Sequence, residues 1–322
     1  MEKITKYLDK HIDTYRLFLP KRLYQLTAIL GAAYSVYKAF SYIRRLGCLV
    51  SIQKNLPRRY GKGTWAVVTG ATEGLGKSFA FKLAEQGFNI VLIARNPDKL
   101  NTTAQEISKQ HGVSTRTIVA DFTQSLKDGF YGDIEAKLKD LDVSILVNNV
   151  AISFKGNIID GDPKAMNDTC YVNMYSQVGM TNILLNRMMQ REKRSAIISI
   201  SSVMGTVPIA GRALYSATKA FNDHFSKALS YAYNSKIDMM TVRPQWIRTR
   251  WISNFPHFFS IPPDELVDGA LNELGKCKVT YGHWKHRIIG PLYKHYPFFR
   301  NWSHSTLQQF RLKQSATTAP SK

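Results

Sequence analysis

Cysteine is scarce in this 322-residue sequence, which has only Cys48, Cys170 and Cys277. Three cysteines so far apart provide neither a disulfide framework nor a metal site, so we expect a reducing compartment and no bound metal. Internal repeats are also absent, and the only low-complexity stretch is the polar tail KQSATTAPSK, which we expect to be disordered. Stability must therefore come from a hydrophobic core, for which 44% hydrophobic residues are enough.

Acidic residues are few as well: 23 Asp and Glu stand against 44 Lys and Arg, a formal net charge of +21. This excess favours anionic partners, namely a phosphorylated cofactor, a phosphate-bearing substrate, a membrane surface or nucleic acid. The basic residues form no dense stripe, and Cys and His lack zinc-finger spacing, so we expect no nucleic acid partner.

The N-terminal part, residues 1–60, contains one long apolar stretch. Residues 1–22 mix both charge signs and form an amphipathic lead rather than a transit peptide. Leu23 to Ile43 follow, 21 residues with Lys38 as the only charge, a length that spans a hydrocarbon core. Their moderate hydrophobicity leaves three alternatives open: a spanning helix, a helix in the membrane interface, or a helix packed on the domain. Cations are more numerous after the stretch than before it, which predicts a cytosolic main domain.

Residues 61–282 alternate short β-rich runs with helical patterns. Near-continuous apolar runs separated by helices predict a parallel sheet covered on both faces, with right-handed crossovers. We therefore expect a single doubly wound α/β domain of Rossmann type. The seven predicted strands are WAVVTG, NIVLIAR, TRTIVAD, SILVNN, SAIISIS, IDMMTVRP and KVTYG.

The C-terminal extension, residues 283–322, is aromatic and basic, and none of its apolar runs is long enough to cross a bilayer. This combination suits a segment at the membrane interface. Packing on the domain, or a contact in a homodimer, is the alternative.

A glycine-rich turn follows the first predicted strand and leads into a helix. Such a turn lets backbone N–H groups and the helix N-terminus approach a pyrophosphate, which predicts a dinucleotide site. The turn comprises Gly70, Thr72, Glu73, Gly74, Leu75 and Gly76.

Arg95 follows the second predicted strand, where a site that prefers NAD would carry an acidic residue for the ribose 2′-hydroxyl. A cation favours a 2′-phosphate instead, so NADP(H) is the predicted cofactor. A solvated loop charge is the alternative interpretation of Arg95.

The motifs TGATEGLG, NNVA, ISS and YSATK occur in this order on alternating predicted strands and helices. With them the chain resembles the short-chain dehydrogenase/reductase family from about Gly63 to Tyr281. Within that family it looks most like the membrane-associated branch of very-long-chain 3-oxoacyl-CoA reductases and 17β-hydroxysteroid dehydrogenases. The finer likeness is carried by the sequence WAVVTGATEGLGKSFAFKLAEQGFNIVLIARN, by the Val of LVNNV, by the preceding apolar stretch and by the tail with TYGHW.

The resemblance implies catalytic roles for four residues. Tyr215 matches the general acid and Lys219, four residues on, its cationic partner, because a tyrosine with a reference pKa near 10 needs a nearby cation to carry phenolate character. Ser202, thirteen residues before Tyr215, matches the donor to the carbonyl oxygen, with Ser199 and Ser201 as alternatives or a strand-end cap as its role. Asn173 resembles the residue that positions a water for proton relay, or is a satisfied polar residue of a helix.

Further cofactor contacts follow from the same resemblance. Asp121 matches the adenine contact, Asn149 the residue that supports the ribose, and Thr249 a contact with the cofactor amide or pyrophosphate; Asp121 and Asn149 are alternatively turn residues. Two positions depart from the family pattern: Ala151 and Gln245 stand where many members have Gly, which crowds the nicotinamide side of the site.

The segment from Gln245 to Glu265 matches the part of related enzymes that covers the substrate. Its aromatic residues, among them Trp246, predict an apolar wall for an acyl chain or sterol, and Arg248 and Arg250 suit the phosphates of coenzyme A or are solvated charges. We expect an NADPH-dependent reductase of a lipid-like ketone, a 3-oxoacyl-CoA or a 17-ketosteroid. A catalytically silent scaffold or subunit of a membrane assembly and an NAD-linked alcohol oxidiser are the alternatives. The branch resemblance implies the endoplasmic reticulum membrane, with a mitochondrial site as the alternative.

Overall fold

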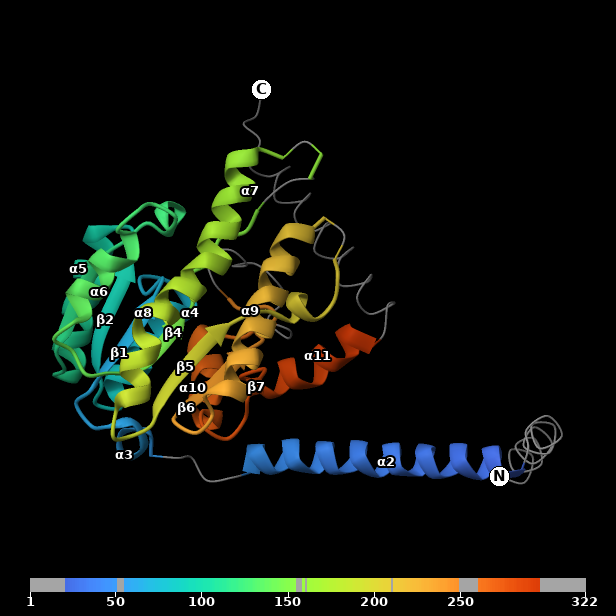
Figure 1. The fold of residues 1–322 in the computed structure, drawn as a ribbon. Coiled ribbons are helices and arrows are strands. Elements are labelled where there is room, and N and C mark those ends of the chain that lie inside the picture. The colour runs from blue at the N-terminus through green and yellow to red at the C-terminus, as the bar shows by residue number, and fades with distance from the viewer. Residues whose placement is uncertain are drawn as a thin grey trace. The chain divides into compact units, whose positions relative to one another are not determined.

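The computed structural model describes residues 21–50, 55–154, 158–159, 161–209, 211–248 and 260–295 (Figure 1). The chain separates into two compact units, Met1–Ile52 and Gln53–Lys322. The first contributes the 30-residue helix α2 (Lys21–Val50). None of the helices in the described ranges combines the length and apolar character needed to cross a membrane.

The second unit is built on one seven-stranded sheet with the order β3-β2-β1-β4-β5-β6-β7. Every neighbouring pair is parallel. The predicted doubly wound α/β fold is therefore confirmed. The strands are β1 (Trp65–Thr69), β2 (Asn89–Ala94), β3 (Thr115–Val119), β4 (Val143–Asn148), β5 (Ser195–Ile200), β6 (Ile237–Val242) and the short β7 (Val279–Thr280).

The sheet divides the hydrophobic core into two layers, because its strands carry apolar residues on both faces. Successive strand residues point to opposite faces. Ala66 and Val68 accordingly belong to the core cluster on one face of the sheet, and Val67 belongs to the cluster on the other. All six residues of β4 are buried, which explains why a central parallel strand has a continuous apolar sequence.

Helices cover both layers (Figure 1). One face carries α4 (Gly74–Glu85), α5 (Pro97–His111) and α10 (Pro263–Glu273). The other carries α6 (Phe130–Leu138), α8 (Ser176–Gln190) and α9 (Ala213–Ala232). The remaining elements are α3 (Leu56–Tyr60), α7 (Pro163–Cys170), α11 (Trp284–His295), the 3₁₀ turns η1 (Phe122–Gln124) and η3 (Val203–Thr206), and the π-helical segment η2 (Tyr171–Tyr175).

Local sequence signals place the helix ends. At the start of α5, the Asn96 side chain accepts a hydrogen bond of 2.9 Å from the backbone N–H of Lys99, and Pro97 occupies the first helical position. At its end, Gly112 adopts a left-handed φ of +67°. These signals fix the position of the β2–α5 loop, which carries Arg95.

Helix α11 packs on the domain through one of its sides. Tyr293 is buried against the apolar residues of the η3 segment, including Val203 and Val207. Trp284 and Ile288 on another side of α11 are 59% and 58% exposed. This part of the predicted C-terminal extension thus packs on the domain, the alternative to a purely interfacial segment, and residues 296–322 lie outside the described ranges.

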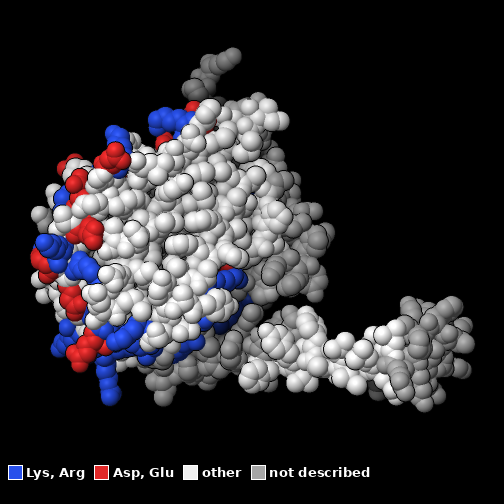
Figure 2. Space-filling model, in the orientation of Figure 1, with Lys and Arg blue, Asp and Glu red and all other residues white. Residues whose placement is uncertain are grey.

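Charged side chains lie mainly at the margins of the face shown in Figure 2, where acidic and basic residues are interspersed. Several charged side chains of the domain form ion pairs, such as Arg116 with Asp140 at 2.6 Å and Arg191 with Asp142 at 2.6 Å. Exposed pairs of this kind contribute little to stability. Each pair joins one cation to one anion, so the net cationic excess of the chain is unchanged.

The strand order reverses between β1 and β4, because the chain builds the sheet outwards from β1 in one direction and then from β4 in the other. Ligands of open parallel sheets bind at the carboxyl ends of the strands at such a switch point. The predicted glycine turn follows β1 and the NNVA motif follows β4. The fold therefore brings the two motifs together.

Candidate active site

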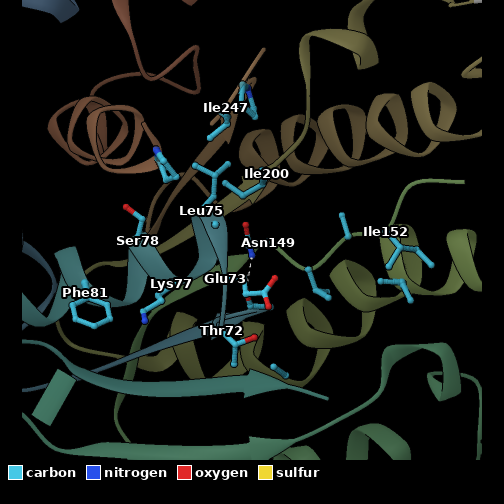
Figure 3. Close-up of a pocket in the computed structure, with 18 of the residues that line it drawn as sticks. Thr72, Glu73, Leu75, Lys77, Ser78, Phe81, Asn149, Ile152, Ile200 and Ile247 are labelled. Atoms are coloured by element: carbon cyan, nitrogen blue, oxygen red, sulfur yellow. Dashed lines mark hydrogen bonds between the residues drawn. The ribbon is translucent and has the colours of Figure 1, made fainter. Parts of the chain in front are cut away.

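An open cleft of about 1250 Å³ lies at the carboxyl ends of the central strands (Figure 3). Most of the predicted site residues line it, although Gly76 and Asn173 do not, and Thr249 lies outside the described residues. The predicted residues that line the cleft are Gly70, Thr72, Glu73, Gly74, Leu75, Arg95, Asp121, Asn149, Ser202, Tyr215 and Lys219.

The glycine turn requires glycine for two different reasons. Gly70 and Gly74 have left-handed φ angles of +65° and +56°, which other residues rarely adopt. Gly76 instead allows close approach: a Cβ atom there would lie 2.1 Å from the carbonyl oxygen of Gly70 and 2.5 Å from Nδ2 of Asn149. The first turn of α4 thus packs directly on the end of β1.

The N-terminus of α4 faces the cleft without a side-chain cap, because Glu73 at the N-cap position makes no capping hydrogen bond. The first N–H groups of a helix have no partner within the helix. Together with the partial positive charge of the helix end, they suit an anion. The turn and α4 therefore fit the diphosphate of a dinucleotide.

Asn149 ties the end of β4 to the glycine turn. Its side-chain Nδ2 donates to the carbonyl oxygens of Thr69 and Gly70 at 2.8 and 3.2 Å. The Thr69 hydroxyl accepts hydrogen bonds from the backbone N–H groups of Asn149 and Val150 at 2.9 and 3.1 Å. This network holds the two sides of the switch point at a fixed spacing, a role that the sequence did not reveal for Thr69.

Arg95 and Asp121 lie at the ends of β2 and β3. Arg95 is exposed, lines the cleft and makes no ion pair within the described residues, so its charge is available to a ligand. The Asp121 carboxylate accepts a hydrogen bond of 3.0 Å from the backbone N–H of Thr123 and caps η1. Asp121 is thus a turn residue that also borders the cleft.

Tyr215 and Lys219 lie on consecutive turns of α9 and both line the cleft. Burial raises the pKa of the Tyr215 hydroxyl to about 12, and a hydrogen bond with Ser202 acts in the opposite direction. Burial lowers the pKa of Lys219, which is 2% exposed, to about 8. At neutral pH the tyrosine therefore keeps its proton and the lysine keeps most of its charge.

The three serines at the end of β5 have different partners. The Ser199 hydroxyl accepts a hydrogen bond of 3.1 Å from Gln177, and the Ser201 hydroxyl donates one of 2.7 Å to the backbone carbonyl of Lys219. Ser202 caps η3 by accepting a bond of 3.1 Å from Met204 N–H, and it also contacts the Tyr215 hydroxyl. The geometry therefore favours Ser202 over the two alternatives as the hydroxyl that faces a substrate.

Asn173 lies in η2, where the helix widens to the π form often found at functional sites. Its side chain is 1% exposed and bonds both backbone groups of Ile152: Oδ1 accepts from N–H at 2.8 Å and Nδ2 donates to C=O at 2.9 Å. Nδ2 also donates to the Thr218 hydroxyl at 3.0 Å. These bonds agree with the alternative of a satisfied polar residue, which positions the loop after β4 next to α9.

The residues after β6 differ from the predicted apolar wall. Trp246 is 4% exposed and does not line the cleft, so this part of the prediction is wrong, whereas its neighbours Ile247 and Arg248 do line it. The reason is a parallel bridge between Ile247 and Ile261, which holds the segment against the domain. Residues 249–259, with the other predicted lid aromatics and Arg250, lie outside the described residues.

Gln245 shows how the substitution of the usual glycine is accommodated. Its backbone N–H donates to Nδ1 of His286 at 3.4 Å, while both polar atoms of its side chain are buried and have no hydrogen-bond partner among the described residues. Ala151, the other departure, lines the cleft. Gln245 lines the cleft as well, and the expected crowding of the nicotinamide side by these two residues stays a prediction.

The arrangement can transfer a proton to a carbonyl oxygen. Tyr215 is a protonated acid beside the Ser202 hydroxyl donor, and the charge of Lys219 lies near enough to stabilise a phenolate. Residues that the sequence did not assign support Asn149 and Asn173 instead: Thr69 accepts from the backbone of Asn149, and Thr218 and the backbone of Ile152 bond the Asn173 side chain. Their partners are distant along the chain, so no local pattern identifies them.

Known proteins with similar sequences or structures agree with this geometry. The model of the short chain dehydrogenase family matches residues 64–257. The very-long-chain 3-oxoacyl-CoA reductase of Anas platyrhynchos is 38% identical over 237 residues, which cover 71% of this chain and 75% of the relative. The inactive hydroxysteroid dehydrogenase-like protein 1 of Homo sapiens is 37% identical over 277 residues, which cover 81% of this chain and 82% of the relative.

Among solved structures, a short-chain dehydrogenase from Sphingobium yanoikuyae in complex with NADPH superimposes with a TM-score of 0.63 at 25% identity, covering 76% of this chain and 95% of that one. The family match spans more than half of the chain, and both relatives exceed 30% identity over more than two thirds of it. The chain therefore belongs to the short-chain dehydrogenase family of oxidoreductases, as its motifs predict.

Proposed function

We propose that this protein reduces a keto group on a lipid substrate with NADPH, a 3-oxoacyl-CoA in the first place and a 17-ketosteroid in the second. The observation that carries the proposal is a single cleft lined by the uncapped turn at α4, by Arg95 and by Tyr215 with Ser202 and Lys219. One part of this cleft fits a phosphorylated dinucleotide, and the other fits a carbonyl that accepts a proton.

NADPH is the cofactor that this cleft suits. Arg95 offers a cation to a 2′-phosphate, and the solved relative from Sphingobium yanoikuyae is in complex with NADPH. When bound, NADPH supplies the hydride for the carbonyl carbon. The protein supplies the rest: Ser202 donates a hydrogen bond to the carbonyl oxygen, Tyr215 gives up its proton to it, and Lys219 stabilises the resulting phenolate.

A lipid-like ketone is supported by the lining of the cleft and by the relatives. Val150, Ile152 and Ile247 are apolar residues in the lining of the cleft. Arg248, also in the lining, suits a phosphate of coenzyme A. The relative from Anas platyrhynchos is named a very-long-chain 3-oxoacyl-CoA reductase, and for this reason we propose acyl-CoA before steroids.

A catalytically silent scaffold is the second candidate, because the human relative is named inactive. The side-chain geometry of this chain favours activity. A scaffold needs neither a lysine buried to 2% exposure one helical turn from a tyrosine nor a serine in the same cleft as that tyrosine. Among the described residues Lys219 has a carbonyl partner but no carboxylate partner, and a cation buried in this way destabilises a fold, so its presence is best explained by function.

The test uses membranes that carry the protein, with NADPH oxidation followed on a panel of 3-oxoacyl-CoA and ketosteroid substrates. We expect turnover with 3-oxoacyl-CoA, and a loss of about 10²- to 10⁴-fold in Tyr215→Phe. If the wild type turned over every substrate no faster than Tyr215→Phe does, the proposal that the protein is an enzyme would be wrong. Turnover of steroids alone would contradict the proposal of an acyl-CoA substrate. Equal use of NADH and NADPH, together with no effect of Arg95→Asp, would favour an NAD-linked oxidiser.

We also propose that α2 lies in a membrane interface, at the endoplasmic reticulum with the catalytic domain in the cytosol. The support is a set of large apolar side chains that are exposed on this helix. Fractionation of the tagged protein, with carbonate and detergent washes, tests the proposal, and recovery with mitochondria would overturn the location. The exposed residues are Leu23, Leu26, Ile29, Leu30, Tyr34, Val36, Tyr37 and Phe40.

A further inference from the structure

An ion pair between Glu73 and Lys99 joins the two loops at the cofactor end of the cleft. Glu73 is the N-cap residue of α4, after β1, and Lys99 lies in the first turn of α5, after β2. The Lys99 ammonium donates a hydrogen bond to the Glu73 carboxylate. Since β1 and β2 are adjacent parallel strands, the pair bridges their carboxyl ends. Glu73 also lines the cleft (Figure 3), so a carboxylate faces the region in which a dinucleotide would bind.

Arg95 is a second cation in this region, four residues before Lys99. It is exposed, lines the cleft and has no acidic partner in the described ranges. The N-terminus of α5 is less available to an anion, because the Asn96 side chain already accepts from the backbone N–H of Lys99. An anion attached to the ribose must therefore be bound by side chains, and Arg95 and Lys99 are the cations at this loop.

The pair can exchange partners at low cost. The side chains of Lys99 and Glu73 are 48% and 40% exposed, and ion pairs of that exposure contribute little to stability. A phosphate monoester carries up to two negative charges and three acceptor oxygens, so it attracts an ammonium group more strongly than one carboxylate does. Lys99 can therefore leave Glu73 for a phosphate, whereas the carboxylate itself repels that phosphate.

We propose that Glu73 and Lys99 set the discrimination between NADP(H) and NAD(H). Glu73 holds Lys99 in the free protein, and Lys99 moves to the 2′-phosphate, beside Arg95, when NADP(H) binds. Glu73 is thus a specificity-determining residue that weakens binding of the 2′-phosphate, both by competition for Lys99 and by repulsion. This inference rests on the proposed function, because it requires that the cleft binds a nicotinamide dinucleotide.

The experiment measures binding by calorimetry to the full chain, with NADPH, NADH, 2′,5′-ADP and 5′-AMP as probes and without substrate. We expect Glu73→Gln to tighten binding of NADPH and 2′,5′-ADP by about threefold to tenfold and to change NADH and 5′-AMP by less than about twofold. Lys99→Gln should weaken binding of NADPH and 2′,5′-ADP, the two probes with a 2′-phosphate, by a similar factor. Asp140→Asn removes one carboxylate from an exposed ion pair outside the cleft, and this control should match the wild type.

The sign of the Glu73→Gln effect decides the proposal. Weaker NADPH binding in that variant would mean that Glu73 positions Lys99 rather than competing for it, and would overturn the inference. An equal change with NADH and NADPH would also overturn it, because the 2′-phosphate would then play no part. Failure of the wild type to bind any of the four probes would instead overturn the proposed function, so the two failures are distinguishable.

Discussion

The ammonium group of Lys219 lies 5.8 Å from the centroid of the Tyr215 ring and donates a hydrogen bond of 2.8 Å to the carbonyl oxygen of Ile200. This bond gives the buried ammonium group a polar partner within the protein interior. Burial at this place also lowers the pKa of Lys219 to about 8. Lys219 therefore loses its charge near pH 8, within the pH range in which enzymes are assayed.

The first prediction concerns pH. As pH rises through about 8, Lys219 loses its proton, the phenolate of Tyr215 loses its counter-charge, and kcat/KM for ketone reduction should fall. Unfolding would not explain the fall, because a lysine whose pKa is lower in the folded than in the unfolded state makes folding more favourable as pH rises from about 8 to 10.5. Lys219→Arg keeps its charge and should lack the fall between pH 7 and 9.5, whatever its absolute rate. Identical profiles for both proteins would exclude Lys219 as the titrating group.

The second prediction separates two neighbouring serines. Ser202→Ala should lower kcat/KM by about 10²-fold, because it removes a donor to the carbonyl oxygen. Ser201→Ala should keep kcat within about twofold and lower the free energy of unfolding by about 1 kcal/mol, because only the bond to the Lys219 carbonyl is lost. Turnover and urea denaturation of both variants are the measurements. Equal losses of turnover in two equally stable variants would contradict this assignment.

The third prediction concerns Asn173. Replacement by alanine leaves the N–H and C=O groups of Ile152 without their side-chain partner, so the free energy of unfolding should fall by about 2–3 kcal/mol, together with turnover. Asn167→Ala, on the exposed side of α7, removes the same side chain without a comparable bond and should change neither quantity by much. Thermal melting and turnover measure both effects. Lost turnover at unchanged stability would instead support the role that the family resemblance implies, in which Asn173 positions a water for proton relay.

Much of this architecture could be predicted because the information is local. Apolar runs with turns between them locate the seven strands, and the glycine turn lies at the junction of β1 and α4 where its backbone chemistry requires it. The spacing of Tyr215 and Lys219 on one helix face is likewise a property of the sequence itself. The family resemblance then supplied Ser202, which the structure brings to the Tyr215 hydroxyl.

The remaining features depend on tertiary contacts. The bonds of Asn173 reach Ile152, which is 21 positions away, and no periodicity in the sequence marks the π-helical turn that directs them. Trp246 was expected in the cleft because it is aromatic, but the bridge between Ile247 and Ile261 buries it. The Glu73–Lys99 pair joins elements 26 positions apart. In each case the partner is determined by how the crossovers place distant loops side by side.

The last prediction tests the packing of α4 on the glycine turn. In Gly76→Ala the new methyl group would lie 2.1 Å from the carbonyl oxygen of Gly70, closer than real contacts allow, so α4 must move away from the turn. NADPH binding should weaken by more than about 100-fold and the protein should melt at a lower temperature, because the diphosphate cradle and its packing are lost together. Gly132→Ala is the matched control: it lies in α6 with open space around its Cβ position and should raise stability by about 0.5–1 kcal/mol with unchanged binding. Calorimetry with NADPH and thermal melting decide between these outcomes, and wild-type affinity in Gly76→Ala would show that close approach of α4 to the turn is not needed for cofactor binding.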